Sequence, residues 1–325
     1  MRFAPALVTS AMVLATVAPC LAADAWRPSR PVAFVNGAAP GGSIDLTGRV
    51  IQRIWDEQKS IGQPVVVINK PGAGNGIAWS YLNDRGSDGH AIAIGTTNLV
   101  SNPVTGAHAI GYRDVTLLAM LFDDFATFIV RADSPYKSMR DVVERLRRDP
   151  AAVSLAFAPS IGSGTHSASI AMLKGAGINA RAARLVAYKS APEAITAVLG
   201  GDIDIAVATT ANLPPLLAAG RIRVIGITSA QRLKGLVAHV PTLKEQSIDA
   251  VFTNWRAVIG PKGMRREHVA YWEAAVGAAV KSEAWQKELD RYFWTANYLT
   301  REPLRAFVER SAQEFRALWA QAAAK

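Results

Sequence analysis

Short apolar runs alternate with amphipathic stretches along the whole chain. We expect helices to begin near Ser43, Gly74, Ser138, Gly164, Ala191, Leu213, Arg266 and Glu302. The runs that predict strands are VAFVN (32–36), PVVVIN (64–69), AIAIGT (91–96), TLLAML (116–121), TFIV (127–130), VSLAFA (153–158), RLVAY (184–188), DIDIAVAT (202–209), RVIGIT (223–228) and RAVIGP (256–261). Strands that alternate with helices at this spacing predict an α/β fold, with mainly parallel sheets flanked by helices.

Local signals mark some ends of these elements. Ser138 is followed three residues later by Asp141, which is typical of a capping box at a helix start. Gly200 and Gly201 follow a helical stretch, where glycine commonly ends a helix. The last stretch places six apolar residues on one face, which predicts an amphipathic helix packed on the body: Leu304, Phe307, Val308, Phe315, Leu318 and Trp319.

The first 23 residues have the pattern of a secretory signal peptide. Arg2 precedes an apolar core that runs from about Ala4 to Val17, and Ala22 and Ala23 offer a cleavage site. Cys20 is the single cysteine, so a lipoprotein anchor is the alternative, although Pro19 directly before it fits that poorly. Cleavage would leave a chain with no cysteine and no disulfide. We expect an exported protein of the bacterial periplasm.

Charge and composition exclude some classes of partner. The 36 basic and 26 acidic residues give a formal net charge of +10. The basic residues are scattered and are not interleaved with aromatic residues, so nucleic acid binding is disfavoured. A mild positive field is compatible with attracting small anions, and it is equally compatible with serving solubility alone.

The glycine-rich loops do not match nucleotide-binding motifs. GGSID (41–45) has no lysine of a phosphate loop, and NKPGAGNG (69–76) does not have GxGxxG spacing. The five histidines are scattered without metal-ligand spacing, so we expect no metal site and no cofactor. We interpret the acidic pairs Asp123–Asp124 and Asp202/Asp204 as solvated strand-edge or turn residues.

Ser163 and His166 raise the hypothesis of a serine hydrolase. They are three residues apart at a predicted helix start, but GxSxG is absent around Ser163. Serine and threonine are common at this position for capping alone. We therefore expect no catalytic residue and no enzyme, and keep an exported hydrolase as an alternative.

Four loops rich in Gly, Ser, Thr and Asn follow predicted strands: AAPGGS (38–43), GTTNLVSNP (95–103), APSIGSGT (158–165) and ATTANLP (208–214). In open α/β sheets, ligands bind beyond the carboxyl ends of the strands. Helix N-termini present unpaired N–H groups that receive carboxylates without a charged side chain. Such loops, without an evident reactive group, indicate a binding cleft.

Several segments, in order, resemble one family of bacterial receptors. They are APGGSIDLTGRVI (39–51), GQPVVVINKPGAGNGIA (62–78), SDGHAIAIGTTNLVSNP (87–103), SLAFAPSIGSGTHSAS (154–169), VAYKSAPEAITAVLGGDIDIAVATT (186–210) and HVPTLKEQ (239–246). The chain resembles the periplasmic substrate-binding receptors of tripartite tricarboxylate transporters, the Bug family, over essentially all of its mature length.

The resemblance implies a two-lobe periplasmic binding protein of the type II, Venus flytrap kind. One lobe would comprise residues 24–124 and 248–325, and the other residues 125–247. A small carboxylate would bind between the lobes and pass to the membrane permease subunits of the transporter. The resemblance also leaves open a sensor that docks to a signalling protein. We expect a monomer in either case.

The resemblance also implies ligand-binding positions, most of them in the two glycine-rich loops that face each other across the cleft. The expected ligand-binding residues are Ala38, Ala39, Pro40, Gly41, Gly42, Ser43, Thr97, Asn98, Ser160, Gly162, Ser163, Gly164, Thr165, Tyr188, Thr210 and Asn212.

The chain departs from the family pattern at a few positions. Gly37 and Ala38 replace a proline and an aromatic residue, which predicts a roomier cleft and permits an aromatic acid. The usual histidine falls on Ala168, and Ser190 stands where glycine is common. Arg256 replaces an aromatic residue. We expect Arg256 to be solvated at the hinge; if it reached the cleft, it would pair with a second carboxylate of the ligand.

Overall fold

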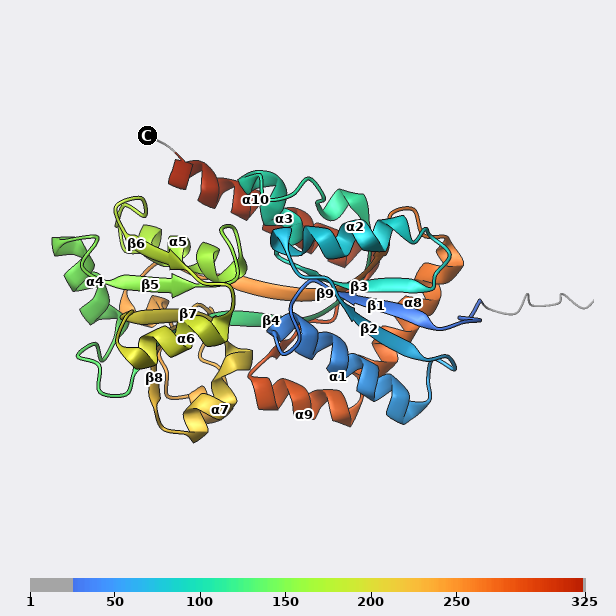
Figure 1. Ribbon diagram of the computed structural model, residues 1–325, viewed down its shortest axis with the longest axis horizontal. Helices are drawn as coiled ribbons and strands as arrows, with labels where there is room; N and C mark the ends of the chain where they lie inside the picture. Colours follow the sequence, from blue (N-terminus) through green and yellow to red (C-terminus); the bar gives the residue numbers. More distant parts are fainter. Residues whose placement is uncertain (1–25, 324–325) are drawn as a thin grey trace, which may run out of the picture.

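The computed structural model describes residues 26–323, so the predicted signal peptide and Cys20 lie outside the described residues. Figure 1 shows an elongated molecule in which helices flank two groups of strands. The strands are β1 Val32–Asn36, β2 Val65–Asn69, β3 Ala91–Thr96, β4 Val115–Arg131, β5 Ser154–Phe157, β6 Arg184–Ala187, β7 Ile205–Thr209, β8 Ile222–Ile227, β9 Thr253–Pro261 and β10 Thr295–Ala296.

The helices account for most of the remaining chain. They are α1 Ser43–Gln58, α2 Gly76–Asp84, α3 Asn98–Thr105, α4 Met139–Arg148, α5 Gly164–Gly175, α6 Ala191–Gly200, α7 Leu213–Ala218, α8 Arg266–Val280, α9 Glu283–Tyr292 and α10 Arg301–Ala323. The expected helix starts did not include α9 or α3, and α3 carries Pro103, a residue that disfavours a helix interior.

The strands form two sheets that share β4. In the first sheet the order is β2-β1-β3-β9-β4, with β1 parallel to β2 and β3, and β9 antiparallel to β3 and β4. In the second sheet β7 and β8 pair antiparallel with β4, and β5 is parallel to β6 and β7. The predicted α/β fold is confirmed, with antiparallel pairings concentrated at β4 and β9.

The strand β4 passes from one sheet to the other without a break. Residues Val115–Phe125 pair with β9, and residues Ala126–Arg131 pair with β7 and β8. The two separate strands predicted at 116–121 and 127–130 are therefore one strand of 17 residues. The acidic pair between the two apolar runs suggested an interruption, but Asp124 is only 1% exposed and continues the strand.

The caps predicted from sequence are present. Ser138 and Asp141 form a reciprocal capping box at the start of α4. Gly201 ends α6 in the left-handed conformation, with φ of 86°, which glycine adopts without steric cost.

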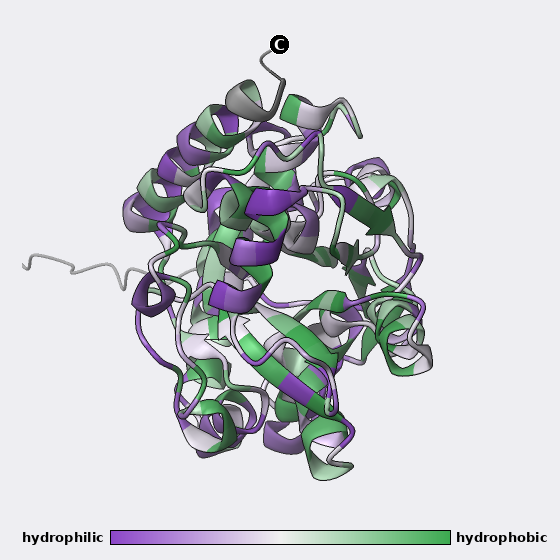
Figure 2. Cartoon of the chain, turned by 90° about the vertical axis from the view of Figure 1, so that its left-hand side faces the viewer, coloured by the Kyte–Doolittle hydropathy of each residue, from purple (hydrophilic) through white to green (hydrophobic). Residues whose placement is uncertain are grey.

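The C-terminal helix α10 connects both groups of elements. It packs against α3 and β4, and it also contacts α5. Figure 2 shows hydrophilic and hydrophobic residues alternating along α10, the helix next to the C-terminus mark. Leu304, Val308 and Phe315 are buried, as the amphipathic pattern predicts.

Candidate functional site

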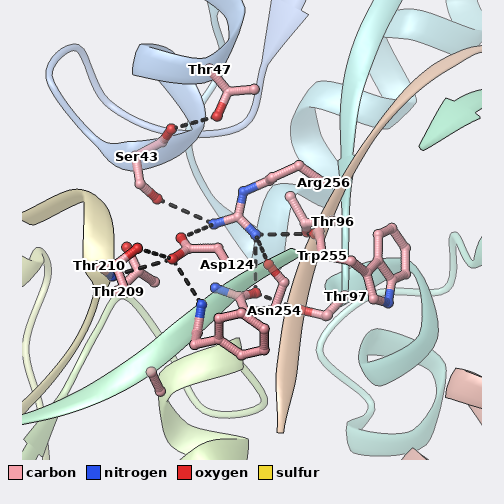
Figure 3. A network of polar contacts seen from close by, with 12 residues as sticks. Ser43, Thr47, Thr96, Thr97, Asp124, Thr209, Thr210, Asn254, Trp255 and Arg256 are labelled. Atoms are coloured by element: carbon pink, nitrogen blue, oxygen red, sulfur yellow. Dashed lines mark hydrogen bonds and ion pairs between the residues drawn. The ribbon is translucent and has the colours of Figure 1, made fainter. Parts of the chain in front are cut away.

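Arg256, on β9, lies at the centre of a buried polar network (Figure 3). Its side chain is 4% exposed, so the expectation that it is solvated is wrong. Nη1 donates to the carbonyl oxygens of Asn254 and Trp255, each at 3.1 Å, and to Asn254 Oδ1 at 3.0 Å. Nη2 donates to Ser43 Oγ at 3.2 Å. The strand β9 runs through the middle of the first sheet, which removes this position from solvent.

Asp124 is the counter-ion of Arg256, with 3.9 Å between Asp124 Oδ2 and Arg256 Nη2. Its Oδ1 accepts hydrogen bonds from the backbone N–H groups of Phe125, at 2.9 Å, and Thr210, at 3.2 Å. The Thr210 hydroxyl oxygen lies 2.8 Å from the same atom. Our interpretation of Asp124 as a solvated strand-edge residue is therefore wrong. Because the β4–β9 register places Asp124 opposite Asn254, Asp124 and Arg256 project from the same face of the sheet.

Burial and charge act in opposite directions on this pair. Burial raises the pKa of Asp124, and the Arg256 guanidinium and the hydrogen bonds from Thr210 oppose that shift. Burial likewise lowers the pKa of Arg256, and the Asp124 carboxylate opposes it. Each group therefore depends on the other to keep its charge in a buried site.

Asn254 joins the network to two helix starts. Its Oδ1 accepts from the Thr97 hydroxyl at 3.0 Å, and Thr97 is the N-cap of α3. Gly164, the first residue of α5, packs directly on Asn254, because a Cβ built on Gly164 would lie 2.5 Å from Asn254 Oδ1. The loop before α5 and the loop before α3 therefore meet at one side chain.

The loop before α1 is held by two polar side chains. Asn69 Nδ2 donates to the carbonyl oxygen of Ala38 at 2.9 Å and to Asp45 Oδ1 at 2.8 Å. Asp45 Oδ2 accepts from the N–H of Gly41 at 2.9 Å. Asp45 also pairs with Arg49, and these donors lower its pKa against the opposing effect of burial. Asn69 and Asp45 thus fix the shape of the loop from Ala38 to Ser43.

The loop before α5 is arranged for capping rather than nucleophilic attack. Ser163 Oγ accepts from the backbone N–H of His166 at 3.4 Å as the N-cap. The Thr165 hydroxyl donates back to the carbonyl oxygen of Ala158 at 2.6 Å. Nδ1 of His166 accepts from the N–H of Gly162 at 3.0 Å, and the ring stacks on Phe157. The hydrogen bond between Ser163 and His166 therefore joins the hydroxyl to the backbone N–H, not to the imidazole that a hydrolase would need.

His166 lies between the loop and the C-terminal helix. Its ring contacts the Trp319 ring of α10 edge-on, with the ring centroids 5.2 Å apart. Burial lowers the pKa of His166 to about 4, so the ring is neutral at neutral pH and keeps Nδ1 as an acceptor.

The structure brings part of the predicted site together. Ser43, Thr97, Gly164 and Thr210 all contact the cluster of Asp124, Asn254 and Arg256. Other predicted residues are engaged elsewhere: the side chains of Asn98 and Asn212 lie 3.4 Å from the hydroxyls of Thr96 and Thr209 respectively, and Tyr188 packs on an apolar cluster. The buried Ser160 Oγ has no partner among the described residues.

Helix N-termini surround the cluster. Ser43 begins α1, Thr97 precedes α3, and Gly164 begins α5. Each N-terminus carries a partial positive charge and unpaired N–H groups. Together with the Arg256 guanidinium, these N-termini favour the binding of an anion. Asp45 and Asp124 lie close by and supply negative charge that partly offsets this preference.

Asp124 and Asn254 were not predicted as site residues. Their signal is polarity within apolar strands: DD lies between VTLLAMLF and FATFIV, and Asn254 precedes the buried Trp255. A charge inside a central strand is costly unless it is paired, so such a position indicates a functional or structural pair.

Two grooves lie on the other face of β4 and β9. One of about 540 Å³ is lined by residues of α5 and α10 together with Trp255. The other, of about 730 Å³, lies between residues 229–235 and residues 286–296, and includes Asp123. Burial raises the pKa of Asp123 to about 6, against a hydrogen bond from Asn297.

Within residues 26–323, no group of three or more His, Cys, Asp or Glu side chains is placed to hold a metal ion. Among the helices of the same residues, none combines the length and the apolar character that a membrane crossing requires.

Comparison with curated proteins finds relatives across most of the chain. A UPF0065 protein from the tcbD-tcbE intergenic region of a Pseudomonas strain is 30% identical over 258 residues, which is 78% of this chain and 74% of that protein. Protein BugT of Bordetella pertussis is 27% identical over 280 residues, which is 83% of this chain and 82% of that protein.

Solved structures show the same fold. A TctC solute-binding protein from Polaromonas is 27% identical with a TM-score of 0.69, over 90% of this chain and 99% of that one. A Rhodopseudomonas palustris protein with adipate is 23% identical with a TM-score of 0.82, over 91% and 98%. The protein MatC from the same species, with bound malate, is 22% identical with a TM-score of 0.76, over 90% and 99%.

The family model that matches spans residues 49–316, which is most of the chain. The matched residues include most of the segments that carry the resemblance in the sequence, and the fold is that of two-lobe periplasmic binding proteins. The chain therefore belongs to the tripartite tricarboxylate transporter family of receptors, the TctC family.

Proposed function

We propose that the protein is a periplasmic receptor that binds a small carboxylate between two lobes and delivers it to the permease subunits of a tripartite transporter. The observation that carries the proposal is the meeting of the starts of α1, α3 and α5 at one buried cluster. Helix N-termini bind carboxylates through backbone N–H groups. Solved relatives of the same fold hold adipate and malate.

The two lobes would be residues 24–124 with 248–325, and residues 125–247. The pairing of β4 supports this division, because its partner changes from β9 to β7 and β8 between Phe125 and Ala126. The chain returns near residue 252, where the N–H of Phe252 still bonds to Thr228 and Thr253 begins β9. Closure by a hinge at these two crossings is a common motion in such receptors.

The ligand's carboxylate would be held by the loops Ala38–Ser43 and Ser160–Thr165, with Thr97 and Thr210 beside them. Binding without turnover fits the family of solute-binding proteins and the hydrogen bond from the Gly162 N–H that occupies His166 Nδ1. Export to the periplasm with cleavage of the first 23 residues fits the compartment of these receptors.

A thermal-shift screen of the exported protein tests the proposed function. The compounds are mono-, di- and tricarboxylates, aromatic acids, amino acids and uncharged analogues. A carboxylate present at a hundredfold its Kd is expected to raise the free energy of unfolding by about 2.7 kcal/mol. Stabilisation by uncharged analogues alone, with no effect of any carboxylate, would refute the assignment of an anion.

Gly164→Ala is expected to weaken carboxylate binding about tenfold or more, because misplaced binding groups lose much of their effect. The added Cβ would lie 2.5 Å from Asn254 Oδ1, so Asn254 must move away from Thr97 and Arg256. Isothermal titration with the ligand found in the screen measures the loss.

Gly200→Ala is the matched control for Gly164→Ala. Gly200 is the last residue of α6, and the Cβ built on it meets only the Asp202 carboxylate, at 3.3 Å. This flexible side chain can move, so we expect unchanged affinity. Equal affinities of the two variants would contradict a role of the Gly164–Asn254 contact in binding.

A further inference from the structure

The Arg256–Asp124 ion pair leaves two of its polar atoms without a hydrogen bond. Arg256 Nε and Asp124 Oδ2 are buried and have no hydrogen-bond partner among the described residues. The two residues are only 3% and 1% exposed. Arg256 Nε is a hydrogen-bond donor, and Asp124 Oδ2 is an acceptor. Leaving such groups unpaired is costly, and more so when they are charged.

Both residues lie where the proposed ligand would bind. Arg256 donates to Ser43 at the start of α1, and Asp124 accepts from Thr210 in the loop after β7. Asn254, bonded to Arg256, packs against Gly164 of the opposite loop. The pair thus lies between the loops that would hold the ligand's carboxylate.

The charges of the pair cancel. A guanidinium keeps its proton under physiological conditions. The adjacent cation, 3.9 Å away, and the donors from Phe125 and Thr210 favour the charged form of Asp124. A second carboxylate of the ligand at Arg256 would lie against the carboxylate of Asp124. Two carboxylates that share a site cannot readily both be ionised, so this arrangement disfavours a dicarboxylate.

We propose that the Arg256–Asp124 pair selects carboxylates whose other end is an uncharged group with one acceptor and one donor, of which a primary carboxamide is the simplest. The ligand's carbonyl oxygen would accept from Arg256 Nε, and its N–H would donate to Asp124 Oδ2. The inference rests on the proposed function, since the carboxylate end is held by the helix N-termini. It replaces the interpretation of Arg256 as the partner of a second carboxylate.

The test compares ligands of equal length that differ only at the far end. Isothermal titration at pH 7.5 of the exported wild-type protein uses diacids, their half-amides and the monoacids without a far polar group, in the C4 to C6 aliphatic and the benzene series. Within the series that binds, we expect the half-amide to bind about tenfold or more tightly than both the diacid and the monoacid.

The outcomes separate the two proposals. If a diacid or a plain monoacid binds as tightly as the half-amide, the proposed selection by the Arg256–Asp124 pair is wrong. The proposed function as a carboxylate receptor is not affected by that result. Binding of uncharged diamides with no binding of any acid overturns the proposed function as well.

An Asp124→Asn variant tests the role of the charge. Its side chain keeps an acceptor for Thr210 and Phe125, while the net charge of the pair becomes positive. We expect the ratio of diacid to half-amide affinity to rise about tenfold or more over wild type. Asp123→Asn is the matched control, because Asp123 is adjacent on β4 and lines the groove on the other face; its ratio should equal that of wild type. An unchanged ratio in Asp124→Asn overturns the proposal.

Discussion

Replacing Arg256 with methionine should lower the free energy of unfolding by about 3–5 kcal/mol, because removal of one partner leaves a buried charge uncompensated. Asp124 is 1% exposed, and its Oδ2 faces the guanidinium. Methionine fills most of the volume of the side chain, so the change removes the charge and its hydrogen bonds to Asn254, Trp255 and Ser43 without opening a large cavity. Urea unfolding of the ligand-free protein at pH 7.5 measures the effect.

The double variant Arg256→Met/Asp124→Asn is the informative control. With the charge of Asp124 also removed, we expect the double variant to recover most of the free energy of unfolding that Arg256→Met loses. The reason is that a buried ion pair contributes little net stability over uncharged residues. Arg148→Met, on the exposed end of α4, is the surface comparison: Arg148 is 70% exposed and pairs with Glu144, so its removal should cost under about 1 kcal/mol. A double variant no more stable than Arg256→Met would contradict the buried-charge explanation.

Opposite pH dependences are expected from His166 and Asp123. The folded-state pKa of His166 is about 4 against an ordinary 6.5, so the unfolded chain binds the proton more readily between these values. Its contribution to stability is complete above pH 6.5, and about 3 kcal/mol is lost as the pH falls to 4.

Asp123 acts in the other direction. Its pKa is raised from 3.8 to about 6 in the folded state, so the folded chain binds the proton more readily in that range. Stability from this group is present below pH 3.8, and about 2–3 kcal/mol of it is lost as the pH rises through 6. In wild type the two contributions largely cancel between pH 4 and 6.

Single variants should reveal each contribution. His166→Phe keeps an aromatic ring on Phe157, and we expect its stability relative to wild type to increase as the pH falls from 6.5 to 4. Asp123→Asn should lose relative stability as the pH falls through 6. Chemical unfolding at steps of half a pH unit gives both curves. Because the other titrating carboxylates are common to all the proteins, difference curves isolate the two groups. Parallel curves for both variants and wild type would contradict the assignments.

The alternation of strand and helix signals predicted the fold class, and the resemblance of several segments in order predicted the family. Strand runs alternate with amphipathic stretches, and the loop at 38–43 joins a fully buried strand to a helix. These signals are local. The sequence did not predict β4 as one strand, because Asp123 and Asp124 look like an interruption between two apolar runs. The cost of burying Asp124 is compensated by its pairing with Arg256 on β9, which is a tertiary contact.

The candidate site was predictable only in part, for the same reason. The loops rich in Gly, Ser, Thr and Asn, together with the family resemblance, identified Ser43, Thr97 and Gly164. The burial of Arg256 depends on β9 lying between β3 and β4, far from them in sequence. No local pattern distinguishes an arginine in that setting from one exposed at a strand end.

The position of β9 sets an order in which the chain can fold. The strand inserts between β3 and β4, although residue 253 follows residue 131 by more than a hundred residues. The second sheet, formed by β5, β6, β7, β8 and residues Ala126–Arg131 of β4, is complete within one continuous stretch of chain. Contacts distant in sequence form late because closing long loops costs entropy. We therefore expect the edges of β3 and β4 that pair with β9 to stay unpaired until the last quarter of the chain folds, so that docking of this stretch is the final step of folding.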